Sequence, residues 1–177
     1  MRVEQGPGFP SGPFVIAANH HSLLDSVIVG AVFGRHAAFL ALSDLFVNYR
    51  LLDWALRQFG VIPVGRSVVP LGAVRAAMDH LAEGGVVGIF PEGTRVVRFG
   101  DVPVRRGAAW LAARSGVPLV PVALIGTGVV LGLDNRLQRG RVRVGVGPAL
   151  TAAGAGTGDI EDLRRRWQEW MVSVLTP

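Results

Sequence analysis

The chain has 177 residues, half of them hydrophobic, which is enough for one domain with a substantial core. It contains no cysteine, which excludes disulfides and any metal or redox site built on cysteine. All eighteen basic residues are arginines and the net charge is +5, so we expect anionic partners. GC-rich coding would explain the arginine total, but not the positions of individual arginines. The first residues lack the apolar stretch of a signal peptide.

Strand-like and helical patterns alternate along the first half of the chain. The sequence predicts a strand over 14–18, a helix over 22–33, a strand over 36–42 and a helix from Ser43 or Asp44 to about Phe59. A strand over 61–64, a helix over 70–83 and a strand over 86–90 follow.

The second half continues the alternation after a loop over 91–103. We expect a helix over 105–115 that ends at Gly116, a strand over 119–125, an irregular stretch to Arg139, a half-exposed edge strand over 141–146, a linker over 152–158 and a last amphipathic helix over 159–175. This succession predicts a single α/β domain over 1–177, with a motif-bearing core over about 14–147. Its central sheet should be mostly parallel, with helices on both faces.

The longest uncharged segment runs from Gly116 to Leu133 and is just long enough to span a membrane. Its prolines at 118 and 121 and its glycines argue against a helix. Its valine-rich part suits a strand, so we expect a central strand and the loop after it.

A polar heptapeptide, Asn19-His20-His21-Ser22-Leu23-Leu24-Asp25, lies between the first strand and the first helix. His20 and Asp25 are five residues apart, so they meet only if His20 lies on the loop and Asp25 in the first helical turn. Ser22 at the N-cap fits that layout, because Ser22-x-x-Asp25 resembles a capping box. The heptapeptide alone leaves a second interpretation open, in which Asp25 only caps the helix and His20 is an ordinary loop histidine.

Two more polar loops follow buried strands. Phe90-Pro91-Glu92-Gly93-Thr94-Arg95 presents a carboxylate and an arginine at a strand end, and Gly60-Val61-Ile62-Pro63-Val64-Gly65-Arg66 adds an arginine past another strand. Two such arginines would clamp a phosphate from two sides. The alternative is an ordinary polar loop with a local pair between Glu92 and Arg95.

These three blocks, together with Val117-Pro118-Leu119-Val120-Pro121-Val122, resemble the four ordered motifs of the glycerolipid acyltransferases, the 1-acylglycerol-3-phosphate acyltransferase family. The blocks cover roughly residues 14 to 125. The resemblance implies transfer of a fatty acyl group from acyl-CoA or acyl carrier protein to the free hydroxyl of a lysophospholipid. With 1-acylglycerol-3-phosphate as acceptor the product would be phosphatidic acid. We expect no cofactor besides the acyl donor.

The chemistry gives the first block a role in this reaction. A neutral His20 would act as general base if Asp25 holds its other ring nitrogen, and no nucleophilic Ser or Cys is required. The resemblance implies that Arg66, Glu92 and Arg95 bind the acceptor, with the two arginines on its phosphate, and that Gly93 and Thr94 shape that loop. It also implies that Arg105 and Arg106 contact phosphates of the acceptor or the donor. Pro121 would support the site near the acyl chain.

The chain departs from the family pattern in two places. Leu42 stands where we expect a lysine after the second strand. The first block begins at residue 19, so the N-terminal membrane helices of many relatives are missing here or belong to another chain. These departures keep open a non-catalytic membrane lipid-binding scaffold. A second alternative, closer to the acyltransferase interpretation, is a phospholipid transacylase that works without CoA.

Other kinds of site find little support. His21 and Asp25 are four residues apart and would share a helix face as metal ligands, but no further His or Cys cluster completes a site, so we predict no metal. The glycines of 126–132 do not match a dinucleotide-binding loop, and neither a serine hydrolase elbow nor a Walker loop occurs.

The last helix carries an apolar stripe with arginines beside it. We expect this helix to dock on the sheet, and the alternative is an interfacial helix with its tryptophans at headgroup depth. The high hydrophobicity and positive charge predict a cytoplasmic protein attached peripherally to the inner face of the cell membrane, on an anionic membrane surface. We expect no nucleic-acid partner.

Overall fold

The computed structural model describes residues 2–5, 9–33, 37–42, 62–64 and 71–176. In this part of the chain seven strands form one sheet in the order β1-β7-β6-β2-β5-β3-β4. Neighbouring strands are parallel except β6 and β7. The strands are β1 (Arg2–Gln5), β2 (Phe14–Ala18), β3 (Ala37–Leu42), β4 (Ile62–Val64), β5 (Val86–Ile89), β6 (Leu119–Ile125) and β7 (Arg143–Val146).

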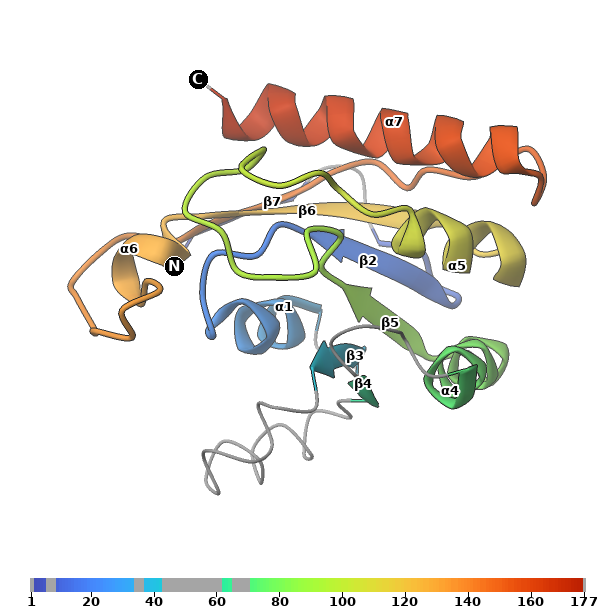
Figure 1. Cartoon of the computed structure of the whole chain (residues 1–177), viewed down its shortest axis with the longest axis horizontal. Helices are drawn as coiled ribbons and strands as arrows, with labels where there is room; N and C mark the ends of the chain where they lie inside the picture. The colour runs from blue at the N-terminus through green and yellow to red at the C-terminus, as the bar shows by residue number, and fades with distance from the viewer. Residues whose placement is uncertain (1, 6–8, 34–36, 43–61, 65–70, 177) are drawn as a thin grey trace.

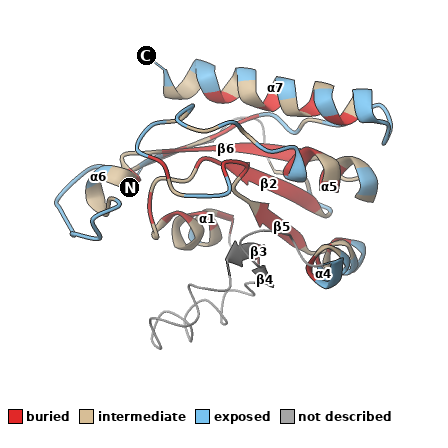
Figure 2. Ribbon diagram, viewed as in Figure 1, coloured by how far each residue is buried: buried red, intermediate tan, exposed pale blue. Residues whose placement is uncertain are grey.

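Helices cover both faces of the sheet (Figure 1). They are α1 (Asp25–Phe33), α4 (Leu71–Ala82), α5 (Gly107–Ser115), the short α6 (Thr127–Val130) and α7 (Thr157–Leu175). Along β2, Phe14, Ile16 and Ala18 pack in the cluster that includes α1. The alternate residues Val15 and Ala17 pack in the cluster that includes α4, α5 and α7. Figure 2 shows that β2, β5 and β6 are buried through most of their length. The predicted α/β class, with a mostly parallel sheet between helical layers, is confirmed.

The last helix docks on the sheet, as its apolar stripe predicts. Trp167 is buried in α7, and its indole N–H donates a hydrogen bond of 2.9 Å to the carbonyl oxygen of Ala17. The neighbouring arginines pair with carboxylates of the same helix, Arg164 with Glu161 and Arg165 with Asp162. With its apolar stripe buried on the sheet, α7 does not offer the face that an interfacial helix requires.

Several predicted elements differ from the structure. The strand β7 is not at the edge, because β1 pairs along its outer side. The helix α1 begins at Asp25, three residues later than predicted, because a turn closes from Asp25 N–H to the Ser22 carbonyl. The helix α7 begins two residues earlier than predicted, and α6 occupies part of the stretch predicted to be irregular. The helix predicted from Ser43 or Asp44 to Phe59 lies outside the described residues.

The segment Gly116 to Leu133, which raised the question of a membrane span, contains β6 and α6. Among the residues that the structure describes, no helix is both long and apolar enough to cross a membrane.

The sheet order brings two of the polar blocks together. Strands β2 and β5 are parallel neighbours, with Ala17 opposite Ile89, so the loops that follow them leave the sheet at the same edge. The heptapeptide after Ala18 and the loop after Ile89 therefore face each other at the carboxyl ends of the strands, where α/β folds commonly bind ligands.

Candidate active site

Asp25 is fully buried at the first position of α1 and organises the loop before it. Its Oδ2 atom accepts hydrogen bonds from the backbone N–H groups of His21 and Ser22, each 2.7 Å long. The hydroxyl oxygen of Ser22 accepts a hydrogen bond of 3.1 Å from the backbone N–H of Leu24. Asp25 thus performs the capping role that the sequence suggested, and this role holds the loop in one conformation.

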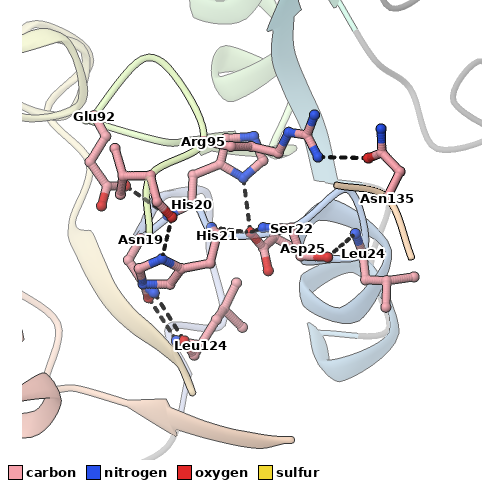
Figure 3. Close-up of polar contacts among 11 residues, drawn as sticks. Asn19, His20, His21, Ser22, Leu24, Asp25, Glu92, Arg95, Leu124 and Asn135 are labelled. Atoms are coloured by element: carbon pink, nitrogen blue, oxygen red, sulfur yellow. Dashed lines mark hydrogen bonds and ion pairs between the residues drawn. The ribbon is translucent and has the colours of Figure 1, made fainter. Parts of the chain in front are cut away.

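The same Asp25 oxygen lies 2.9 Å from Nδ1 of His20 (Figure 3). A carboxylate accepts hydrogen bonds and a neutral imidazole has one N–H, so this contact fits the tautomer that carries its hydrogen on Nδ1 and leaves the lone pair on Nε2. The Phe90 ring stacks on the imidazole, with centroids 4.1 Å apart and the planes 13° from parallel. The His20 side chain is 17% exposed, and the contacts with Asp25 and Phe90 fix the orientation of its ring on two sides.

His21 points elsewhere. Its Nδ1 atom lies 2.8 Å from the carbonyl oxygen of Val96, and the Val96 N–H donates to the His20 carbonyl at 2.9 Å. These contacts clamp the heptapeptide to the loop after β5. The metal-ligand pairing of the His21 ring with Asp25 is not the arrangement found. The described ranges contain no group of three or more His, Cys, Asp or Glu side chains placed around a metal position.

Asn19 has a role that sequence reasoning did not assign. Its side chain is fully buried, with the amide donating to the Leu124 carbonyl at 2.9 Å and the Leu124 N–H donating back to Oδ1 at 2.7 Å. This two-way contact continues the pairing of β2 with β6 one step past the end of β2. The position of Asn19 directly after a buried strand could have indicated this role, because a buried polar side chain needs hydrogen-bond partners.

Glu92 is 2% exposed and lies directly behind His20. Its Oε2 accepts the backbone N–H of His20 at 2.7 Å. Burial raises the pKa of Glu92 to about 8; the hydrogen bond from His20 opposes this shift, and the charge of Asp25 adds to it. Within the described residues, Oε1 of Glu92 and Oδ1 of Asp25 are buried without a hydrogen-bond partner.

The rest of the loop after β5 shapes the same edge. Arg95 is half-buried and donates from Nη1 to the side-chain oxygen of Asn135 at 3.0 Å, so a local pair with Glu92 is not what holds it. Gly93 has a φ of 69°, and the Arg105 guanidinium lies across it, since a Cβ atom there would be 3.0 Å from Nε. Thr94 is exposed. The backbone angle favours glycine at 93, and the absence of a side chain there leaves room for the flexible Arg105 guanidinium.

Two predicted site residues, Arg106 and Pro121, are not brought to this point. Arg106 is exposed at the start of α5, where its charge joins the hydrogen bond from Arg164 in lowering the pKa of Glu161 on α7. Pro121 is buried within β6, opposite Ala17 rather than at the carboxyl end of the strand. Arg66 and the side chain of Leu42 lie outside the described residues.

A comparison of the sequence with protein-family models identifies the family of this chain. Residues 1–125 match the family model described as Acyltransferase. The chain belongs to this acyltransferase family. It is 34% identical over 136 residues to a chloroplastic 1-acyl-sn-glycerol-3-phosphate acyltransferase of Brassica napus, which covers 75% of this chain and 39% of the relative. It is also 34% identical over 114 residues to a 1-acyl-sn-glycerol-3-phosphate acyltransferase of Bacillus subtilis, covering 64% of this chain and 56% of the relative.

The fold agrees with a solved structure of the same class. The crystal structure of the 1-acyl-sn-glycerophosphate (LPA) acyltransferase PlsC from Thermotoga maritima matches with a TM-score of 0.75 at 22% identity, over 99% of this chain and 73% of that one. The membership predicted from the four sequence blocks is confirmed. In this member of the family, the described parts of the first and third blocks form one hydrogen-bonded site, and the second block extends beyond the described residues.

Proposed function

We propose that this protein transfers a fatty acyl group from acyl-CoA or acyl carrier protein to the free hydroxyl of a lysophospholipid. The first choice of acceptor is 1-acylglycerol-3-phosphate, which would give phosphatidic acid. The observation that carries the proposal is the 2.9 Å contact between His20 Nδ1 and Asp25 Oδ2 at the carboxyl edge of the sheet. The Brassica napus and Bacillus subtilis relatives are named 1-acyl-sn-glycerol-3-phosphate acyltransferases, which supports the choice of acceptor.

The proposed reaction uses His20 as general base. Its Nε2 takes the proton of the acceptor hydroxyl while the hydroxyl oxygen attacks the thioester carbonyl. The tetrahedral intermediate then collapses, the C–S bond breaks, and the imidazolium returns the proton to the departing thiolate. An ester and a free thiol result. Asp25 keeps His20 in the tautomer with a free Nε2 and stabilises the imidazolium between the two steps.

The acceptor would bind along the loop after β5. A guanidinium has five N–H donors, and the Asn135 contact uses one from Arg95, which leaves others for a phosphate. Arg105 lies across Gly93. Arg66, which follows β4 in the sequence and lies outside the described residues, is the further candidate for the phosphate. Gly93 and Thr94 would give the loop its shape. The unpartnered Oε1 of Glu92 suits a hydroxyl of the glycerol backbone, and Arg106 remains a candidate for a donor phosphate.

The test is an assay of the purified protein with labelled acyl-CoA and acyl-carrier-protein thioesters and a panel of lysolipids. We expect transfer to 1-acylglycerol-3-phosphate above the other acceptors. Labelled phospholipid as sole acyl source tests the transacylase alternative. No transfer from any donor to any acceptor would contradict the proposal. Vesicle binding that is unaffected by acceptor, without turnover, would instead favour the lipid-binding scaffold.

We also propose peripheral attachment to the inner, cytoplasmic face of the cell membrane. The net charge of +5 and an amphiphilic acceptor support it. Flotation with anionic vesicles should weaken as salt rises, because charge attraction at a surface is screened over about 10 Å at moderate ionic strength. Recovery only by detergent, at any salt concentration, would contradict peripheral attachment.

A further inference from the structure

The segment after β6 forms an exposed hairpin, which we call the α6 hairpin and define as residues 126–143. It begins at Gly126, continues through α6, and returns to β7. Leu131 and Leu137 form an antiparallel bridge across it, and the Gln138 N–H donates to the Val130 carbonyl at 2.8 Å. Figure 1 shows the hairpin projecting past the end of the sheet, and Figure 2 shows its outer part exposed.

The base of the hairpin is closed tightly. Gly126 has a φ of 86°, and a Cβ atom on it would collide with the carbonyl oxygen of Arg141. Only glycine permits both the angle and this approach of the two arms. The backbone geometry at Gly126 and Arg141 therefore fixes the base of the hairpin.

The hairpin also touches both blocks of the active site. Arg95 donates to Asn135, which adopts a positive φ of 56° that asparagine tolerates. A Cβ atom on Gly128 would lie 3.2 Å from the Cβ of His21. Whatever surface the hairpin contacts is thus brought next to the catalytic pair.

Apolar side chains gather on this hairpin. Among the described residues six large apolar side chains are exposed, and three of them belong to the hairpin: Val129 at 60%, Leu133 at 45% and Leu137 at 78%. Single exposed apolar side chains need no explanation, but a group on one protruding element indicates contact with an apolar environment.

Arginines are interspersed with these apolar residues along the hairpin. The hairpin carries four arginines and one acidic residue, Asp134, which gives it a net charge of +3. Arg141 and Arg143 line a surface pocket together with Arg2 and Val142. Apolar side chains interspersed with arginines match the boundary of an anionic leaflet, where acyl chains lie just below phosphates. An acidic protein surface would satisfy the arginines but would give the leucines no acyl layer.

We propose that the α6 hairpin is the membrane-contact surface of this protein. Val129, Leu133 and Leu137 enter the boundary between headgroups and acyl chains of an anionic leaflet, while Arg136, Arg139 and Arg141 lie at phosphate depth. This orientation turns the carboxyl edge of the sheet toward the bilayer. An amphiphilic acceptor would then reach His20 directly from the leaflet, a last step that rests on the proposed function.

The absence of cysteine permits a direct test of insertion. In Leu137→Cys the single thiol is labelled with an environment-sensitive dye, and vesicles of phosphatidylcholine and phosphatidylglycerol are added. We expect a blue shift and a severalfold rise in emission. Leu71→Cys is the matched control, because Leu71 is 88% exposed on α4, which lies far from α6 in Figure 1. An unchanged Leu137 signal, or equal changes at both positions, would overturn the proposal.

Vesicle partitioning measures the two chemical contributions. Leu137→Asp should lower the partition coefficient about tenfold, and Leu71→Asp should leave it unchanged. Arg136→Ala and Arg139→Ala should each lower it about fivefold on anionic vesicles and hardly at all on neutral ones. Equal losses for Leu71→Asp and Leu137→Asp would contradict a defined contact surface.

These measurements contain no acyl acceptor, so they stand even if the proposed reaction fails. With short-chain, monomeric donor and acceptor, the hairpin variants should keep their turnover. Loss of that turnover would place the hairpin in the catalytic machinery instead. A lipid-free dimer that Leu137→Asp converts to monomer, seen by light scattering, would assign the surface to a second copy of the chain. Weakened use of a carrier-protein thioester alone, with vesicle binding intact, would assign it to an acidic protein.

Discussion

The loops that follow β2 and β6 leave neighbouring parallel strands at the same edge of the sheet, yet they are built in opposite ways. After β2, Asn19, Ser22 and Asp25 are buried and hold backbone groups of their own loop or of β6. After β6, every residue from 133 to 141 is exposed. The first loop is fixed by hydrogen bonds inside the protein, whereas the second presents arginines and leucines outward.

The contrast follows from what each loop is proposed to do. Proton transfer needs a base whose position is set to within a fraction of an ångström, and buried neighbours that hydrogen-bond the loop supply that. A surface that binds lipids needs apolar side chains that stay exposed, so these side chains cannot pack in the protein core. Substitutions in the first loop should therefore change the chemical step, and those in the second should change where the protein binds.

The largest effect is expected at the pair His20 and Asp25. His20→Ala should lower the rate of the chemical step by about a hundredfold or more, the usual contribution of a general base. Asp25→Asn should cost a similar factor, because it spoils the tautomer and orientation of the ring. The double variant should be no slower than the worse single one, since the two residues act as a unit. Single-turnover rates with soluble substrates measure this, with circular dichroism to verify folding. Losses that multiply would mean the two residues act independently.

The second effect concerns Arg95, which connects the two regions. Arg95→Ala should cost on the order of 2–4 kcal/mol in kcat/KM for a phosphate-bearing acceptor, because a charge-assisted contact is lost from a half-buried site. The loss should shrink for an acceptor without phosphate. We expect the same pattern for Arg66→Ala, at a position outside the described residues.

Asn135→Ala is the matched control for Arg95. It removes the 3.0 Å bond between the hairpin and Arg95 but keeps the guanidinium charge. We expect kcat/KM to change by no more than a few fold. If Asn135→Ala and Arg95→Ala lose equally on both acceptors, then the arginine holds the loops together and does not bind phosphate.

The third effect is a dependence of stability on pH that comes from Glu92. Its pKa is raised to about 8, so between the ordinary carboxyl range and pH 8 the folded protein holds a proton that the unfolded chain releases. The free energy of unfolding should therefore fall as pH rises through this window, by about 1 kcal/mol per pH unit from this group. Glu92→Gln keeps an acceptor for the His20 N–H and should remove that slope. Denaturant unfolding of both proteins between pH 5 and 8 tests this, and identical slopes would show that Glu92 ionises normally.

The sequence predicts the elements of the site better than their connections. The layout of His20 on a loop and Asp25 in the first helical turn follows from local spacing and the capping pattern, and the structure confirms it. The two hydrogen bonds between Asn19 and Leu124 join residues 105 positions apart in the sequence. The hydrogen bond from Arg95 to Asn135 joins residues 40 positions apart. Nothing local in the chain indicates such partners, because they are set by which strands become neighbours.

The sheet itself shows the same limit. The alternation in 141–146 correctly predicts one buried face, carried by Val144 and Val146. It does not tell whether another strand pairs along the outer side, because that depends on backbone groups and not on side chains. The four residues of β1 have no apolar alternation of their own, so neither β1 nor the interior place of β7 was predicted.

The smallest effect is expected at His21, next to the proposed base. His21 does not share the Asp25 carboxylate through its ring, since Nδ1 lies against the Val96 carbonyl. His21→Ala should therefore keep most of the activity and cost about 1 kcal/mol of stability, the usual net value of one hydrogen bond. The Val96 N–H would still hold the His20 carbonyl, so the clamp between the loops would loosen without opening.

Two measurements decide whether His20 and His21 are correctly assigned. The rate of His21→Ala, compared with His20→Ala on the same soluble substrates, should lie close to wild type, and chelator treatment should change neither the wild type nor the variant. Turnover that survives in His20→Ala but vanishes in His21→Ala would reverse the assignment. It would require the His21 ring to leave Val96 and turn toward Asp25 four residues on, the pairing that a shared helix face would allow. The ring would have to give up its 2.8 Å contact with the Val96 carbonyl and share Asp25 Oδ2 with the backbone N–H groups of His21 and Ser22, which already donate to that oxygen.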